Sequence, residues 1–176
     1  MPDTANYFEL FQLPATFDVD PDILTRHYHI LQRTSHPDRH TQSVDTAQRL
    51  ALQHAMTINE AYQTLKDPLQ RAIYLLNLQG IHPDTADNTQ DSAFLMEQMA
   101  LREELAGIPQ QPDPGAAADH IQDKIRGLIT TQLADLTNWF ATPGKPHIAC
   151  VAVHKLQFLY KLQQEATRLA SRLNQS

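Results

Sequence analysis

The sequence predicts an all-α protein that consists of two small helical domains. Apolar residues recur at spacings of three and four along most of the 176 residues, as they do on one face of a helix. No segment of useful length alternates apolar and polar residues in the manner of a half-buried strand. Glycine is scarce, with 5 residues, which argues against a chain full of tight β-turns. A hydrophobic fraction of 41% is enough to fill the cores of such domains.

Residues 1–79 are expected to form a helical hairpin with a short helix on each side. Asp20 is a good N-cap and Pro21 suits the first helical position, so the first hairpin helix begins there and stops at Pro37. A longer helix follows over residues 44–66, and the alternating spacings let the two helices pack antiparallel. The positions that carry the helical spacing are Tyr7, Leu10 and Phe11, then Leu24, Tyr28 and Leu31, and then Ala47, Ala51, His54, Ile58, Ala61 and Leu65. The last are Ala72, Leu75 and Leu76, in a helix that Pro68 opens and Gly80 closes.

A three-helix bundle over residues 91–176 is expected after a polar, helix-averse linker at residues 80–90. Its first helix spans residues 91–107, and its second runs from about residue 116 to 141. A turn at residues 143–146 leads to the third helix. The inward residues are Ile121, Ile125, Leu128, Ile129, Leu133, Leu136 and Phe140 in the second helix, and Leu159, Leu162, Ala166, Leu169 and Leu173 in the third.

Composition and charge narrow the class of function. The net charge of −6 gives no reason to expect nucleic-acid binding. The single cysteine, Cys150, allows no internal disulfide and fits a reducing compartment. The first residues lack the basic and apolar regions of a signal peptide, and no apolar run approaches the roughly 20 residues of a membrane span. We therefore expect a cytoplasmic protein without a membrane partner.

The stretch from Thr34 to His40, TSHPDRH, interrupts the helical pattern with a rigid, polar corner. It gathers His36, Asp38 and Arg39 around one proline, between two helices that are expected to pack together. A loop stiffened in this way presents an imidazole, a carboxylate and a guanidinium at little ordering cost on binding. This arrangement favours a docking loop.

Two other interpretations of the corner stay open. His36 and Asp38 could form an acid–base pair, but no glycine-rich phosphate loop, nucleophile elbow or second carboxylate accompanies them. A metal site would draw on a histidine cluster that consists of His27, His29, His36 and His40. The proline after His36 disfavours helix there, and residues two apart on a helix do not face the same way. We therefore expect neither an enzyme nor a resident metal or cofactor.

The first 76 or so residues resemble a J domain, the module that activates seventy-kilodalton heat-shock chaperones. YFELFQLP resembles its opening, Tyr28 and Leu31 followed by HPD resemble its second helix and signature tripeptide, and INEAYQTLKDPLQRAIYLL resembles its third and fourth helices. The chaperone-docking residues that the resemblance implies are His36, Pro37, Asp38, Arg26, Arg33 and Arg39. Ser35 departs from the pattern, since an aromatic residue commonly precedes the tripeptide, and His27 and His29 stand where lysines are expected.

With FLMEQMALREEL after the J domain and KLQFLYKL in the last helix, the whole chain resembles the HscB family, the J-domain co-chaperones of iron–sulfur cluster assembly. The resemblance implies that the J domain stimulates ATP hydrolysis by the specialised chaperone HscA, and that the bundle delivers the scaffold protein IscU as the client. Eukaryotic relatives often carry an N-terminal cysteine module, so its absence implies a bacterial type. The alternative is a generic J-protein that serves a general folding chaperone, with the bundle as a dimerisation or spacer element.

The helix over residues 91–107 has two apolar sides. At 100° per residue, Phe94, Leu101 and Leu105 form one arc, and a second arc roughly 140° away contains Leu95, Met96 and Met99, here named the methionine arc. The first arc suits the bundle core, and the second remains for the J domain, another helix or a partner. The resemblance favours a partner and implies the scaffold-binding residues Leu95, Met96, Met99, Arg102, Glu103 and Phe158, with Ala100 in place of an acidic residue. For Phe158, a place in the core at the edge of the last helix's stripe stays open as the alternative.

Overall fold

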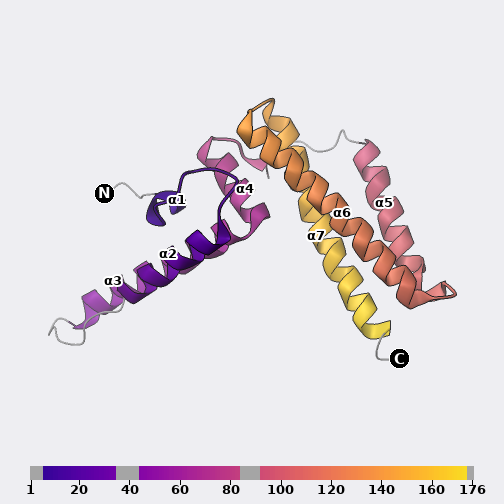
Figure 1. The fold of residues 1–176 in the computed structure, drawn as a ribbon, viewed down its shortest axis with the longest axis horizontal. Coiled ribbons are helices and arrows are strands. Elements are labelled where there is room, and N and C mark those ends of the chain that lie inside the picture. Colours follow the sequence, from indigo (N-terminus) through magenta and orange to yellow (C-terminus); the bar gives the residue numbers. More distant parts are fainter. Residues whose placement is uncertain (1–5, 35–43, 84–91, 174–176) are drawn as a thin grey trace. The chain divides into compact units, whose positions relative to one another are not determined.

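A computed structural model describes residues 6–34, 44–83 and 92–173 (Figure 1). These residues fold into helices and contain no strand, which confirms the all-α prediction. The elements are α1 (Tyr7–Leu10), α2 (Pro21–Thr34), α3 (Val44–Lys66), α4 (Pro68–Leu78), α5 (Ser92–Gly107), the 3₁₀ helix η2 (Ile108–Gln110), α6 (Pro114–Ala141) and α7 (Pro146–Leu173). They belong to two compact units, unit 1 (Met1–Gln79) and unit 2 (Gly80–Ser176).

Helices α2 and α4 begin where the sequence supplies an aspartate cap. The Asp20 carboxylate accepts hydrogen bonds from the backbone N–H groups of Asp22 at 2.9 Å and Ile23 at 3.1 Å. Asp67 caps α4 in the same way by accepting a hydrogen bond from the N–H of Gln70 at 2.9 Å. Each cap is followed by proline at the first helical position, where the missing N–H has no helical partner to lose. The local sequence therefore determines both helix starts.

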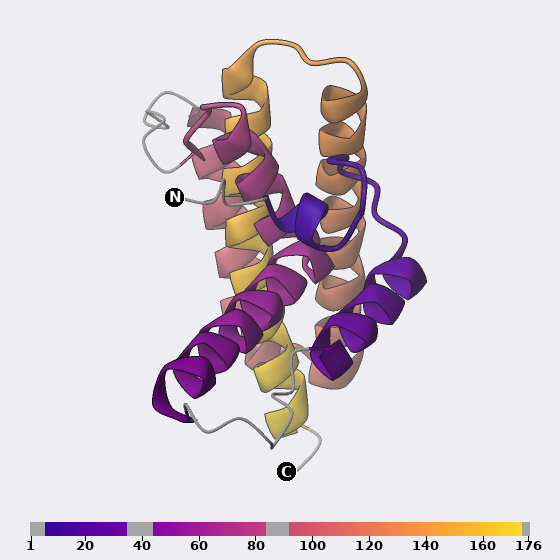
Figure 2. The ribbon, with the colours of Figure 1, turned by 90° about the vertical axis from the view of Figure 1, so that its left-hand side faces the viewer.

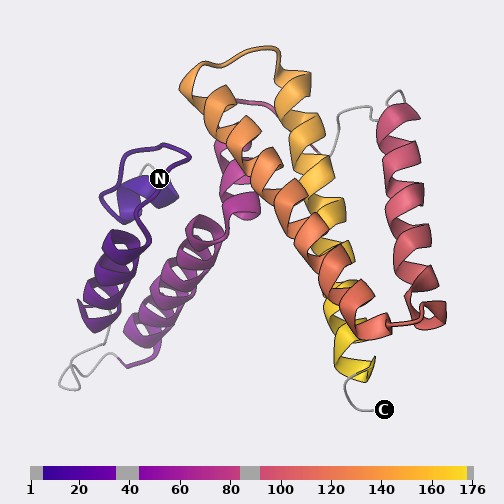
Figure 3. The ribbon, with the colours of Figure 1, turned by 45° about the vertical axis from the view of Figure 1, so that its right-hand side comes forward.

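Unit 1 is held together by a core between α1, α2, α3 and α4. Helices α2 and α3 lie side by side as the predicted hairpin (Figure 3). The largest fully buried side chains of this unit are Phe8, Phe11, Leu24, Ile58, Leu65 and Leu76. Burial of each such side chain contributes about 1.5–3 kcal/mol relative to exposure. The hairpin is thus anchored by the segments on either side of it.

Helix α1 is fastened to α4 through a pair of tyrosines. The rings of Tyr7 and Tyr74 stack with their centroids 4.4 Å apart, and the Tyr74 hydroxyl accepts a hydrogen bond from the N–H of Tyr7 at 2.8 Å. The side chain of Asn6 caps α1 by accepting a hydrogen bond from the N–H of Glu9 at 3.0 Å. A helix of 4 residues has no stability of its own, so α1 depends on these contacts.

Unit 2 is built on α6 and α7, two helices of 28 residues that run antiparallel and side by side (Figure 2). Helix α5 packs against both. The fully buried side chains between them include Ile121, Ile125 and Leu136 of α6 and Leu156 and Leu162 of α7. The Lys124 ammonium group of α6 also donates a hydrogen bond to the Glu104 carboxylate of α5 at 2.6 Å.

Two details of α6 differ from the sequence prediction. The helix begins at Pro114 because the side chain of Asp113 accepts a hydrogen bond from the N–H of Ala116 at 2.9 Å. Trp139, which the pattern did not assign to the core, is 6% exposed, whereas Phe140 is only partly buried. Neighbouring residues on a helix point about 100° apart, so spacing alone does not determine which ring meets the facing helix.

Candidate interaction surfaces

The polar corner of the sequence lies outside the described residues, and with it the predicted docking residues His36, Pro37, Asp38 and Arg39. The structure describes the two helices that carry the corner, α2 and α3. The structure therefore describes the helices before and after the corner, and the docking role of these four residues stays a prediction.

The two arms of the hairpin are linked by a polar and aromatic cluster. The rings of Tyr28 and Tyr62 stack with their centroids 4.0 Å apart. The Tyr28 hydroxyl donates a hydrogen bond to the Asn59 side-chain oxygen at 2.8 Å and accepts one from the Gln32 amide at 2.6 Å. These contacts fix α2 against α3 at positions that the apolar stripe alone does not determine.

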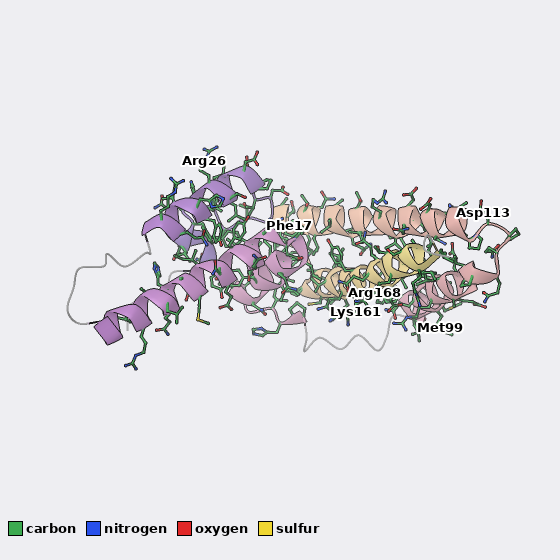
Figure 4. The ribbon with its side chains drawn as sticks, turned by 90° about the horizontal axis from the view of Figure 1, so that it is seen from below. Phe17, Arg26, Met99, Asp113, Lys161 and Arg168 are labelled. Atoms are coloured by element: carbon green, nitrogen blue, oxygen red, sulfur yellow. The ribbon has the colours of Figure 1, made fainter. Side chains whose placement is uncertain are left out.

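One side of α2 is basic and exposed. Arg26, Ile30 and Arg33 follow one another at spacings of four and three, and all three are exposed. The Ile30 side chain is 52% exposed, and Arg26 points away from the hairpin (Figure 4). This side of unit 1 therefore offers two positive charges around an apolar centre.

His27 does not belong to this exposed side. Its Nδ1 lies within hydrogen-bond distance of the Phe11 carbonyl oxygen, and because a carbonyl only accepts, Nδ1 carries the proton and donates it. The spacing gave no signal for this contact, since the two residues are 16 positions apart. His27 thus links α2 to the segment after α1.

The described part of the chain has no group of three or more His, Cys, Asp and Glu side chains that could hold a metal ion. It also has no helix long and apolar enough to cross a membrane.

Helix α5 buries one of its apolar arcs and exposes the other. Leu101 and Leu105 are 3% and 8% exposed, whereas Leu95, Met96 and Met99 are 58%, 71% and 64% exposed. Met99 lies on the outer side of unit 2 (Figure 4). Adjacent exposed apolar side chains of this size commonly mark an interaction site. The methionine arc is thus an accessible surface of unit 2.

The edge of the methionine arc consists of Arg102, Glu103 and the ring beneath them. Arg102 and Glu103 are exposed, as the sequence predicted. Phe158 of α7 is 8% exposed. Its ring meets the ring of Phe94 edge to face, with the two centroids 6.1 Å apart. The Arg102 guanidinium carbon lies 5.6 Å from the centroid of the Phe158 ring. The structure therefore places Phe158 in the layer that supports α5, and leaves little of its ring accessible to a partner.

The structure contains a groove beside this edge that the sequence analysis did not predict. It has a volume of about 460 Å³ and lies between α5 and α7. The lining residues that give it its character are Arg102, Leu105, Glu165, Arg168, Leu169 and Arg172, and it is here named the arginine groove. The spacing of Arg168 and Arg172 on α7 was the available signal, but only the approach of α5 adds Arg102 to them.

Two family models match the chain, one for each unit. Residues 6–74 match the DnaJ domain, and residues 90–167 match the HSCB C-terminal oligomerisation domain. A curated relative from Vibrio cholerae, named co-chaperone protein HscB homolog, is 41% identical over 169 residues. That alignment covers 96% of this chain and 98% of the relative.

Solved structures show the same arrangement of helices. The chaperone HscB from Vibrio cholerae has a TM-score of 0.85 and 41% identity, over 96% of this chain and 99% of its own. The human co-chaperone HscB has a TM-score of 0.83 and 30% identity, over 94% of this chain and 83% of its own. The Jac1 co-chaperone from Saccharomyces cerevisiae, at 23% identity and a TM-score of 0.74 over 96% of this chain and 95% of its own, shows the shared fold alone.

Trimming the methionine arc should leave the stability of the protein nearly unchanged. The triple variant Leu95→Ala, Met96→Ala and Met99→Ala removes exposed side chains and leaves no internal cavity. Leu101→Ala, on the same helix but buried, is the matched control and should cost about 2–5 kcal/mol. Thermal melts followed by circular dichroism measure both. A fall in Tm for the triple variant as large as that of the control would show that the arc is part of a core.

Proposed function

Because the chain belongs to the HscB co-chaperone family, we propose that it stimulates the ATPase of an HscA-type heat-shock chaperone and delivers the iron–sulfur scaffold protein IscU to it. The observation that carries the proposal is one chain with both a DnaJ domain and an exposed apolar arc on α5 of the other unit. Hydrolysis takes place in the active site of the chaperone, so the proposed role uses no catalytic residue of this chain. The bacterial relative supports a place in the bacterial cytoplasm.

For the chaperone, we propose a docking surface that joins the corner to the exposed side of α2. Arg26 and Arg33 would attract an acidic chaperone surface over several ångströms and raise the rate of encounter. The Asp38 carboxylate and the His36 imidazole would then fix the docked geometry through charge-assisted hydrogen bonds. The contacts of Tyr28 support this proposal because they fix the arm that carries the arginines.

For the client, we propose that the methionine arc is the centre of the binding surface. Interfaces typically combine an apolar centre with a polar rim, and Arg102 and Glu103 would supply the rim. Methionine side chains are flexible and polarizable, so they adapt to the shape of a partner. Phe158 would contribute to client binding indirectly, because its ring holds Arg102 and Phe94 of α5 in place.

A second candidate function follows from the name of the C-terminal family, an oligomerisation domain. In that case the methionine arc would pack against a second copy of the chain, and the protein would be a generic J-protein that serves a general folding chaperone. Sedimentation velocity across a range of concentrations distinguishes the two functions, because only self-association depends on the concentration of this chain alone.

The methionine arc should be necessary for scaffold binding. The triple alanine variant should bind IscU at least 100-fold more weakly, as expected when a cluster of hot-spot residues worth several kcal/mol is removed. Isothermal titration calorimetry measures the Kd. The matched control is Leu52→Ala with Met56→Ala, which trims two side chains of α3 that are 63% and 64% exposed, and it should bind like the wild type. Retained scaffold binding, together with a change from dimer to monomer, would favour the oligomerisation function.

The corner should be necessary for stimulation of the chaperone. His36→Gln or Asp38→Asn removes a charge-assisted hydrogen bond of roughly 1.5–3 kcal/mol, so stimulation at sub-saturating protein should fall about 10- to 150-fold. A steady-state ATPase assay of the chaperone measures this effect. Both variants should still bind IscU, which serves as the control for folding. Undiminished stimulation by both variants would contradict the docking role of the corner.

Salt should weaken stimulation through the basic side of α2. Raising the ionic strength from about 10 mM to 150 mM shortens the Debye length from roughly 30 Å to 8 Å and screens the attraction. The double variant Arg26→Gln with Arg33→Gln should start lower and respond less to salt than the wild type. Arg126→Gln removes an exposed guanidinium of α6 and is the control. An identical salt response of the wild type and the double variant would count against electrostatic docking.

A further inference from the structure

Basic residues gather on α7 although the chain as a whole is acidic. The net charge of the chain is −6, yet α7 contains four Lys and Arg residues and Glu165 as its single acidic residue. Lys161, Arg168 and Arg172 are all exposed. Figure 4 shows Lys161 and Arg168 on the side of unit 2 on which Met99 lies. The methionine arc therefore has a positively charged neighbour.

Three arginines and one glutamate line the arginine groove. Arg102 comes from α5, and Arg168 and Arg172 come from α7. In the part of the chain that the structure describes, neither Arg168 nor Glu165 forms an ion pair. The wall of the groove is apolar where Leu105 and Leu169 reach it. The charge of Arg168 is thus not neutralised by Glu165, the one acidic residue that lines the groove.

The Arg102 guanidinium connects the groove with the methionine arc. It lies over the Phe158 ring, 5.6 Å from its centre, and this contact limits the positions that its side chain adopts. A partner that covers the arc would therefore meet the groove as the next surface along α5 and α7. A guanidinium matches the planar geometry of a carboxylate and forms two parallel hydrogen bonds with it.

The geometry points to the arginine groove as a docking site for an acidic segment of the client, whose Asp or Glu carboxylates bind Arg102, Arg168 and Arg172. This inference rests on the proposed function, because it assigns the client that covers the methionine arc a second point of contact. The apolar arc would supply most of the affinity, and the groove would set the orientation of the client and the rate of its association. A second copy of this acidic chain is the competing occupant.

The test uses the full chain and changes only exposed charges. Arg168→Gln with Arg172→Gln removes two charges of the groove, and glutamine keeps the helix propensity of arginine. Arg126→Gln, which removes an exposed arginine of α6, is the matched control. The first measurement is the Kd of IscU at about 50 mM and about 500 mM salt, since the Debye length falls severalfold between them. The second is the binding of a fluorescein-labelled hexaglutamate peptide, followed by fluorescence anisotropy.

The groove variant should bind IscU at least tenfold more weakly than the control at low salt, and the difference should disappear at high salt. It should also lose binding of the hexaglutamate peptide, whereas the triple alanine variant of the methionine arc keeps it. Equal binding of IscU by the groove variant and the control overturns the inference. So does a change from dimer to monomer in the groove variant, which would make a second copy the occupant.

The peptide separates this inference from the proposed function. If IscU fails to bind the wild type, the proposed client is wrong, and loss of peptide binding in the groove variant still supports a site for acidic segments. If the peptide binds the groove variant and the control equally, the groove has no such site, whatever IscU does.

Discussion

The packing of one side of α5 against the rest of unit 2 determines which surface this unit offers to a partner. Leu101 and Leu105 are almost fully buried, and Phe94 meets the ring of Phe158. Because residues of a helix are separated by a fixed 100°, burial of this side forces the methionine arc outward. A helix held in this way presents its exposed side in one orientation, so a partner loses little free energy in ordering it. For the proposed binding of a client, the buried side of α5 would therefore be as necessary as the exposed side.

Unit 1 uses the same principle with different chemistry. The stacked rings of Tyr28 and Tyr62, with the hydrogen bond to Asn59, hold α2 against α3, and the buried residues around α1 and α4 hold the hairpin from below. Ordering one backbone residue costs about 1–2 kcal/mol, so a docking loop gains affinity when the helices that carry it are fixed in advance. The side of α2 with Arg26 and Arg33 is fixed by the same contacts.

The sequence predicted the helices well because their signals are local. The cap at Asp20, the helix start at Pro68 and the arcs of α5 are encoded by residues within a few positions of each other, and the structure shows them as expected. Contacts between distant residues were missed. His27, for example, donates a hydrogen bond to the Phe11 carbonyl. For Phe158 the sequence left open a partner-binding role and a core role, and its burial shows that tertiary packing decides which residue at the edge of a stripe becomes buried. The corner with its HPD tripeptide was predicted from the sequence and from resemblance, and its docking role remains to be measured.

The net charge of the whole chain gave no indication of the arginine groove. A net charge sums over all faces of a molecule, whereas a bound segment responds only to charges within about one Debye length, roughly 8 Å at physiological salt. Three arginines and one glutamate line the groove, so its local balance of charge is positive. An apolar arc by itself binds many hydrophobic segments, because burial of apolar surface has no direction. Charged groups at a fixed place beside the arc would favour a client with matching carboxylates and disfavour others through unpaired or like charges. The groove would therefore contribute selectivity to a surface whose affinity comes from the methionine arc.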